Sequence, residues 1–90
     1  MQSFRGDDQA YLQWAEAHGS AYVINRAVKA PGTAMVHTAQ CMHIYAPNEV
    51  YNHTGNEKVC SESMDELLDW AKTNQLAVKE CSTCKPYSVA

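Results

Sequence analysis

Two segments of the chain repeat apolar residues at the spacing of a helix with one buried face. We predict the first helix over residues 8–18, with Asp7 or Asp8 capping its N-terminus. Its apolar stripe consists of Tyr11, Leu12, Trp14 and Ala15. The second helix is predicted to begin at Ser63, which has the spacing of a reciprocal cap with Glu66. Its buried face consists of Met64, Leu67, Leu68 and Ala71.

Between these helices the pattern changes to the alternation expected of β-strands. Residues 21–28 are rich in β-favouring side chains and predict one strand. The Pro31-Gly32 pair predicts a type II turn, after which residues 34–38 return as the second strand of a hairpin. Alternation along that strand places Met35 and His37 on the same face.

The order of the predicted elements is typical of a small α+β protein. A polar loop over residues 46–57 leads to a short strand over residues 58–60, which precedes the second helix and a Cys-rich tail. We therefore expect a single α+β domain over residues 1–90. A chain of this size buries only about 60–65% of its unfolded surface, so a metal or disulfides would add needed stability.

Charge and hydropathy exclude several classes of protein. Apolar residues are 46% of the chain, too many for a disordered protein. Seven Lys and Arg against ten Asp and Glu give a net charge of −3, which argues against a polybasic membrane patch. No apolar run resembles a membrane span or a signal segment. We therefore expect no membrane partner and a cytoplasmic protein, in which thiols stay reduced.

The cysteines carry the main chemical signal. Cys81 and Cys84 have the C-x-x-C spacing with which two thiolates in a tight turn bind one zinc ion, with bonds of about 2.3 Å. His37 lies near the end of the predicted hairpin, and Cys41 comes four residues later. They add an imidazole and a third thiolate. We predict a structural zinc site of His37, Cys41, Cys81 and Cys84, which ties the hairpin to the C-terminal tail.

Other interpretations of the same residues stay open at this point. Cys60 or His43 can replace His37 as the fourth ligand, although Cys60 fits a small buried core position better. A redox dithiol usually lies at the N-terminus of a helix, and Pro86 so close to Cys84 argues against a helix there. Disulfides among the four cysteines are a further alternative.

The order of these motifs resembles the zinc-binding domain family of the methyl-phosphotriester DNA repair protein Ada. The matching segments are residues 36–41, 58–61, 67–71 and 81–86. The resemblance implies zinc at His37, Cys41, Cys81 and Cys84, and a bacterial or phage protein, since similar modules are attached to bacterial nucleases. In the repair protein all four ligands are cysteines, one of which accepts a methyl group from a DNA phosphotriester. His37 at the first position here argues against that acceptor activity.

We expect a non-enzymatic zinc-binding domain that contacts another protein or a nucleic acid. Four protein ligands leave zinc no open position, which argues against hydrolysis. The net charge of −3 makes a protein partner at least as plausible as a nucleic acid. The alternative function is a thiol that accepts methyl groups, as in DNA repair, and a third is a small phage protein that inhibits a host factor.

Overall fold

The structure, a computed structural model, describes residues 1–26, 32–46 and 53–89. These residues form strands and helices in the order β1 (Gln2–Phe4), α1 (Asp8–Ala17), β2 (Tyr22–Arg26), β3 (Thr33–Thr38), β4 (Glu57–Ser61), α2 (Met64–Thr73), β5 (Ala77–Glu80) and α3 (Pro86–Val89). A five-stranded sheet with helices packed on it confirms the predicted α+β fold class. No helix within the three described ranges has the length and apolar character needed to cross a membrane.

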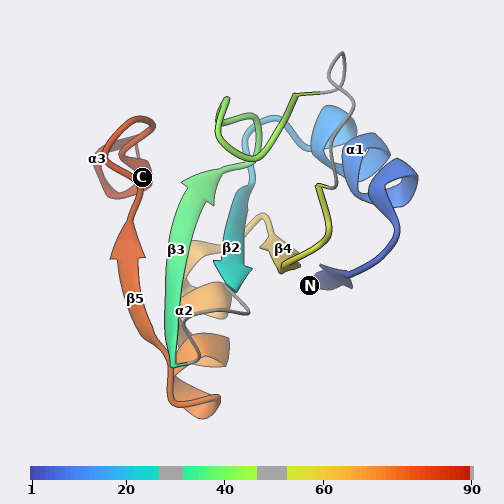
Figure 1. Ribbon diagram of the computed structural model, residues 1–90. Helices are drawn as coiled ribbons and strands as arrows, with labels where there is room; N and C mark the ends of the chain where they lie inside the picture. The colour runs from blue at the N-terminus through green and yellow to red at the C-terminus, as the bar shows by residue number, and fades with distance from the viewer. Residues whose placement is uncertain (27–31, 47–52, 90) are drawn as a thin grey trace.

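The sheet is mixed, with the strand order β1-β4-β2-β3-β5. The predicted hairpin is present, because β2 and β3 pair antiparallel, and β4 pairs antiparallel with the other side of β2. β5 runs parallel to β3, after a crossover through α2 that passes over the two central strands. The carboxyl ends of β3 and β5 therefore lie at the same edge of the sheet (Figure 1).

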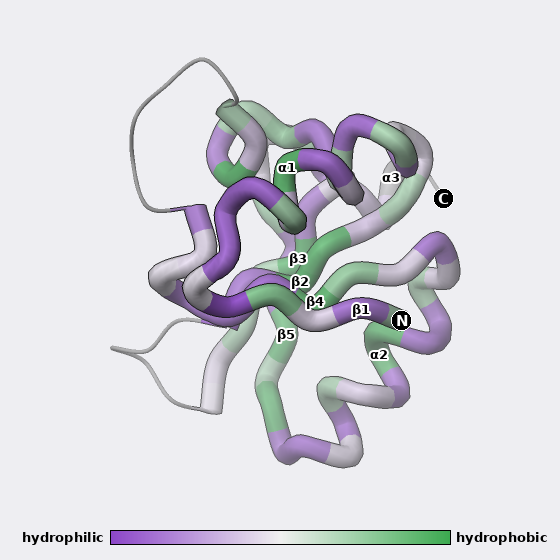
Figure 2. Tube along the Cα trace, turned by 90° about the vertical axis from the view of Figure 1, so that its right-hand side faces the viewer, coloured by the Kyte–Doolittle hydropathy of each residue, from purple (hydrophilic) through white to green (hydrophobic). Residues whose placement is uncertain are grey.

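Alternation along the strands divides the core between the two faces of the sheet. Leu67 and Ala71 of α2 pack on one face, against Ile24, Val36 and Val59. In Figure 2 many of the hydrophobic segments lie along the strands. Helices α1 and α2 lie on different sides of these strands. These side chains supply the hydrophobic burial that holds α2 to the sheet.

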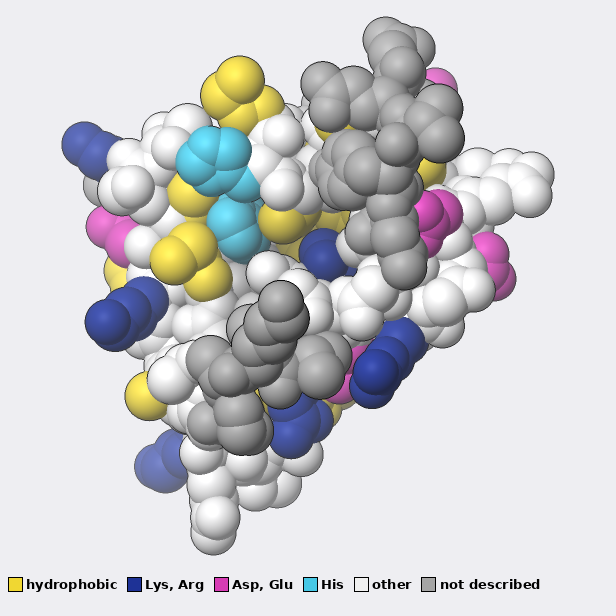
Figure 3. Space-filling view, viewed as in Figure 1, with side chains coloured by type: hydrophobic (Ala, Val, Ile, Leu, Met, Phe, Trp, Pro, Cys, Tyr) yellow, Lys and Arg dark blue, Asp and Glu magenta, His cyan; other side chains and the backbone are white. Residues whose placement is uncertain are grey.

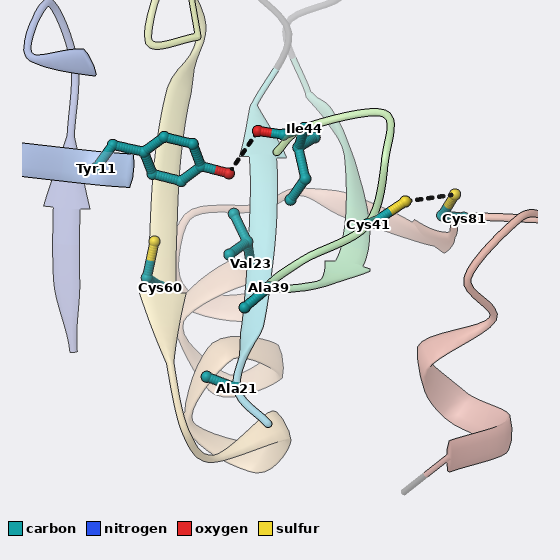
Figure 4. Packing of buried hydrophobic residues seen from close by; sticks show 8 residues of the cluster. All are labelled: Tyr11, Ala21, Val23, Ala39, Cys41, Ile44, Cys60 and Cys81. Atoms are coloured by element: carbon teal, nitrogen blue, oxygen red, sulfur yellow. Dashed lines mark hydrogen bonds between the residues drawn. The ribbon is translucent and has the colours of Figure 1, made fainter. Parts of the chain in front are cut away.

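The other face carries the second part of the core, which α1 and the segment after β3 cover (Figure 4). Tyr11 of α1 is fully buried there with Val23 and Cys60, and Ala39 and Ile44 come from the segment after β3. The Tyr11 hydroxyl donates a hydrogen bond to the Ile44 carbonyl oxygen at 2.9 Å. This bond connects α1 to the segment that contains Cys41.

Both predicted helices begin close to the expected residues. Asp7 caps α1 by accepting a hydrogen bond from the Ala10 N–H group, and Ser63 caps α2 by accepting one from the Glu66 N–H group at 3.2 Å. The reciprocal half of the predicted cap is absent from the described contacts. Glu66 accepts instead from the Ser61 hydroxyl group, which in turn accepts from the Ser63 N–H group.

Three short elements were not predicted. β1 and β5 are edge strands of three and four residues, too short for alternation to be recognised. The prediction of no helix after Cys84 is wrong, because α3 begins at Pro86. Proline is favoured at the first position of a helix, where its missing N–H group costs nothing. The predicted turn at Pro31 and half of the polar loop, residues 47–52, lie outside the described residues.

Candidate metal centre

The parallel pairing of β3 and β5 brings the two halves of the predicted site together. His37 lies near the end of β3, and Cys41 follows in a turn. The Cys41 N–H group donates to the Thr38 carbonyl oxygen at 3.0 Å. Cys81 directly follows β5, and its N–H group donates to the Val36 carbonyl oxygen at 2.9 Å. Cys84 completes the turn after β5, so all four side chains lie at one end of the sheet.

The donor atoms of His37, Cys41, Cys81 and Cys84 all lie within 4.8 Å of one another, and the cluster can hold a metal ion. The Sγ atoms of Cys41 and Cys81 point toward each other at 3.9 Å (Figure 4). Bonds of about 2.3 Å to a shared tetrahedral zinc ion place two sulfur atoms about 3.8 Å apart. The sulfur spacing therefore fits two thiolates on one ion.

His37 has the character of a metal ligand. Its side chain is buried, and among the described residues its Nδ1 atom has no hydrogen-bond partner. A buried nitrogen without a partner carries a desolvation cost that a metal bond removes. Burial, with smaller contributions from the charges of His43 and Lys58, lowers the pKa of His37 to about 4. The imidazole is thus neutral at pH 7, the form that binds a metal.

The turn after β5 prepares one thiolate in particular. Burial alone would raise the pKa of Cys81, but hydrogen bonds from the backbone N–H groups of Cys84 and Thr83 and contact with His43 lower it to about 6. The Thr83 N–H group lies 3.4 Å from the Cys81 Sγ atom. In contrast, burial raises the pKa of Cys41 to about 12, with additional contributions from the neighbouring thiols of Cys84 and Cys81. Of these two thiols, Cys81 is therefore the one that loses its proton at the lower pH.

Backbone contacts also orient Cys84. The Thr38 N–H group, at the end of β3, donates to the Cys84 Sγ atom at 3.3 Å. The turn closes with a hydrogen bond from the Lys85 N–H group to the Cys81 carbonyl oxygen at 2.9 Å. Lys85 has a φ of 46°, a left-handed conformation that redirects the chain into α3. Such N–H···S hydrogen bonds spread the negative charge of a thiolate centre.

The structure separates the alternative ligands from the four-residue cluster. Cys60 is fully buried in the core with Tyr11 and Val23, as its sequence context predicted. Burial raises the pKa of the Cys60 thiol to about 12. His43 lies outside the cluster of four but beside it, with Nδ1 3.7 Å from the Cys81 Sγ atom and Nε2 3.5 Å from the Thr83 hydroxyl oxygen. His43 can therefore donate a hydrogen bond to the Cys81 Sγ atom from outside the cluster.

All four cysteines are free thiols in the described chain. The 3.9 Å between the Cys41 and Cys81 sulfur atoms far exceeds the roughly 2.05 Å of a disulfide bond. The short helix α3 begins beyond Cys84, so the C-x-x-C turn precedes it rather than forming its first turn.

Comparisons of the chain with models of known families, with curated proteins and with solved structures give no match. The resemblance to the Ada zinc-binding family therefore stays a prediction from the motifs.

Proposed function

We propose that His37, Cys41, Cys81 and Cys84 hold one zinc ion with a structural role, in a non-enzymatic domain that binds a protein or a nucleic acid. The observation that carries the proposal is the gathering of one imidazole and three thiols within 4.8 Å, from two segments far apart in sequence. Three thiolates with one imidazole form a donor set typical of structural zinc. The bound ion would supply a tetrahedral link between the ends of β3 and β5.

A structural role agrees with the burial of the site. Cys41 is 4% exposed and Cys81 is 1% exposed, so neither sulfur is open to a substrate. Four protein ligands also leave no position for the metal-bound water that hydrolytic zinc enzymes use. A buried metal site with four protein ligands would hold the ends of β3 and β5, and the surface around them, in one geometry.

Metal content of single variants tests the ligand set. We expect the purified chain to carry one zinc, measured by native mass spectrometry together with elemental analysis. His37→Ala should lose zinc or bind it far more weakly. Cys60→Ala is the matched control, because it also removes a buried side chain, and it should keep a full equivalent. The reverse pattern, zinc retained in His37→Ala and lost in Cys60→Ala, would show that the ligand set is wrong.

Salt dependence distinguishes the two classes of partner. A nucleic-acid complex loses affinity steeply as salt rises, because phosphate contacts release counterions. We expect a protein partner to show a weaker dependence, as the net charge of −3 disfavours many phosphate contacts. Binding of a short DNA or RNA duplex that persists at 50 mM salt and disappears at about 200 mM salt would favour the nucleic-acid class.

The alternative function, a methyl-accepting thiol, has one supporting observation. Cys84 is partly exposed, unlike the buried Cys41 and Cys81, so its sulfur is the one that a methyl donor can reach. Mass spectrometry after incubation with DNA that carries methyl phosphotriesters tests this function. A stable gain of one methyl group on Cys84 would establish an acceptor, and an unchanged mass would leave the binding domain.

A further inference from the structure

One row of residues crosses four strands on the sheet face opposite α2. The strand registers pair Lys58 with Asn25, Asn25 with Met35, and Met35 with Lys79. Their neighbours Ile24, Val36 and Val59 pack against α2, so the four residues of this Lys58–Lys79 row lie on the other face. The two lysines at its ends are about 14 Å apart along the row, since neighbouring strands are spaced by about 4.8 Å.

Lys58 is a buried cation, and the described part of the chain gives it no carboxylate within ion-pair distance. It is only 5% exposed, and its Nζ atom donates to Asn25 Oδ1 at 2.9 Å and to the Asn56 carbonyl oxygen at 3.4 Å. No carboxylate of the described residues forms an ion pair with it. Burying a charge that is not neutralised costs free energy, and an apolar residue would avoid this cost. Lys58 is thus a candidate for a residue that is retained for a role other than stability, and its contact with Asn25 points to that neighbour.

Lys58 and Lys79 each have a glutamate next to them in the sequence, and alternation along the strands places both glutamates on the sheet face that α2 covers. Glu57 pairs with Arg26 at 3.6 Å, and Glu80 accepts a hydrogen bond from the Tyr87 N–H group. Asp8 contributes a negative charge near Lys58, but its oxygens accept hydrogen bonds from Thr54 and His53. Figure 3 shows Lys and Arg side chains spread over this face and Asp and Glu mostly toward its margins. The row therefore presents positive charge.

A hollow of about 290 Å³ lies over part of the row, lined by Asn25, Thr33, Ala34, Met35 and Lys79. Its volume is at the lower end of the range for small-molecule sites. Met35 is 38% exposed and offers apolar contact in the middle of the row. Because Lys58 occupies the side-chain oxygen of Asn25, the Asn25 amide N–H groups are left as donors.

We propose that the Lys58–Lys79 row binds a small organic phosphate. The phosphate group contacts the Lys79 ammonium group and the Asn25 amide in the hollow, Lys58 holds the Asn25 side chain in place through its side-chain oxygen, and the apolar part of the ligand lies over Met35. A phosphate monoester carries up to two negative charges, which suit a hollow that Lys79 lines and Lys58 adjoins, and its oxygens accept several hydrogen bonds. The size of the hollow and the net charge of −3 favour a small ligand over a polyanion. This site does not depend on the metal centre.

An NMR titration of the full-length chain, as purified, tests the proposal. Adenosine 5′-monophosphate is the probe, and adenosine and inorganic phosphate are the comparisons. We expect saturable shifts of the Asn25 side-chain amide and of the Met35 and Lys79 backbone amides, with weaker binding of inorganic phosphate and none of adenosine. Equal binding of adenosine, or no saturable shift in the row at millimolar concentrations of the monophosphate, would overturn the proposal.

Two variants separate binding from folding. Lys58→Met should weaken monophosphate binding about tenfold, because the Asn25 amide loses the partner that orients it and the hollow loses a neighbouring positive charge, while thermal stability is kept or raised. Asn25→Asp places a carboxylate beside Lys58 with almost no change in shape, and it should also abolish binding. Lys72→Met, on exposed α2, is the matched control and should bind normally. Unchanged affinity in a folded Asn25→Asp or Lys58→Met protein would overturn the proposal.

The last part of the experiment compares the monophosphate with polymeric anions. An oligonucleotide or an acidic peptide that shifts the row, when the monophosphate does not, would replace the small ligand by a polyanion and overturn the proposal. Monophosphate binding that an oligonucleotide cannot displace would support it. Zinc content is measured in every sample, so loss of the metal centre is distinguished from loss of this site.

Discussion

Asp8 shows how one side chain fixes a long-range contact. It occupies the first position of α1, and its carboxylate accepts hydrogen bonds from the backbone N–H groups of His53 and Thr54 at 2.8 and 2.9 Å. The Thr54 hydroxyl group also donates to it. These hydrogen bonds, that from the Thr54 hydroxyl first, outweigh the effect of burial and lower the pKa of Asp8 to about 2. The carboxylate thus connects α1 to the segment before β4.

Asp8→Asn should lower the free energy of unfolding at pH 7 by about 1–3 kcal/mol, because hydrogen bonds to an ionised acceptor are lost. The pKa of Asp8 is lower in the folded chain than its ordinary 3.8, so its ionisation stabilises the fold above that value. The stability difference between native and variant should be constant above about pH 5 and shrink as the pH falls from 4 toward 2. Urea denaturation across this range measures it, and a gap that widens with acid would contradict the assignment.

The positions of two histidines could not be predicted from the sequence. His53 lies in a turn within the loop predicted over residues 46–57, but its side chain is buried, with its Nε2 atom 3.1 Å from the Ala46 carbonyl oxygen. His43 was considered only as a ligand, whereas it lies beside Cys81. Neither position could be predicted, because each depends on a partner more than six residues away in the sequence. Cys60, in contrast, was placed correctly in the core by its local pattern.

At the scale of elements, α2 begins with a cap from the Ser63 side chain. Ser63→Ala should lower the free energy of unfolding by about 1 kcal/mol, because the Glu66 N–H group loses its acceptor. The exposed Ser20→Ala is the matched control, with an expected change near zero. Thermal or urea denaturation gives both values, and equal effects of the two substitutions would show that the cap does not stabilise α2.

Helices and hairpin were predictable because their signals are local. The apolar stripe of α2 and the alternation along β3 span enough residues to define a period. The parallel pairing of β5 with β3 was not predictable, because it is set by the crossover through α2. For the same reason, the sequence could not reveal that Lys58 and Lys79 share one row.

At the scale of the whole molecule, the candidate metal centre joins two strands that would otherwise depend on a single ladder. Among the described residues, β5 is an edge strand that pairs with β3 alone, and Cys81 directly follows its last residue, Glu80. The sequence predicted the four ligands from the spacing of two short motifs, and the structure brings them together. Their closeness depends on the direction of β5, which no local pattern specified.

Removal of zinc by a chelator should therefore loosen one edge of the sheet before the rest. Hydrogen exchange should accelerate first over residues 77–85, because the ends of β3 and β5 lose their link. β4 is the internal control, since it lies between β1 and β2 and away from the metal centre. Exchange that accelerates equally in β4 and β5, or in neither, would contradict a local structural role for the ion.

X-ray absorption spectroscopy at the zinc edge of protein purified without added metal tests the central claim most directly. The account predicts one zinc per chain, bound by three sulfur atoms at about 2.3 Å and one nitrogen atom at about 2.0–2.1 Å. A folded chain without metal, or sulfur atoms joined as disulfides, would contradict it.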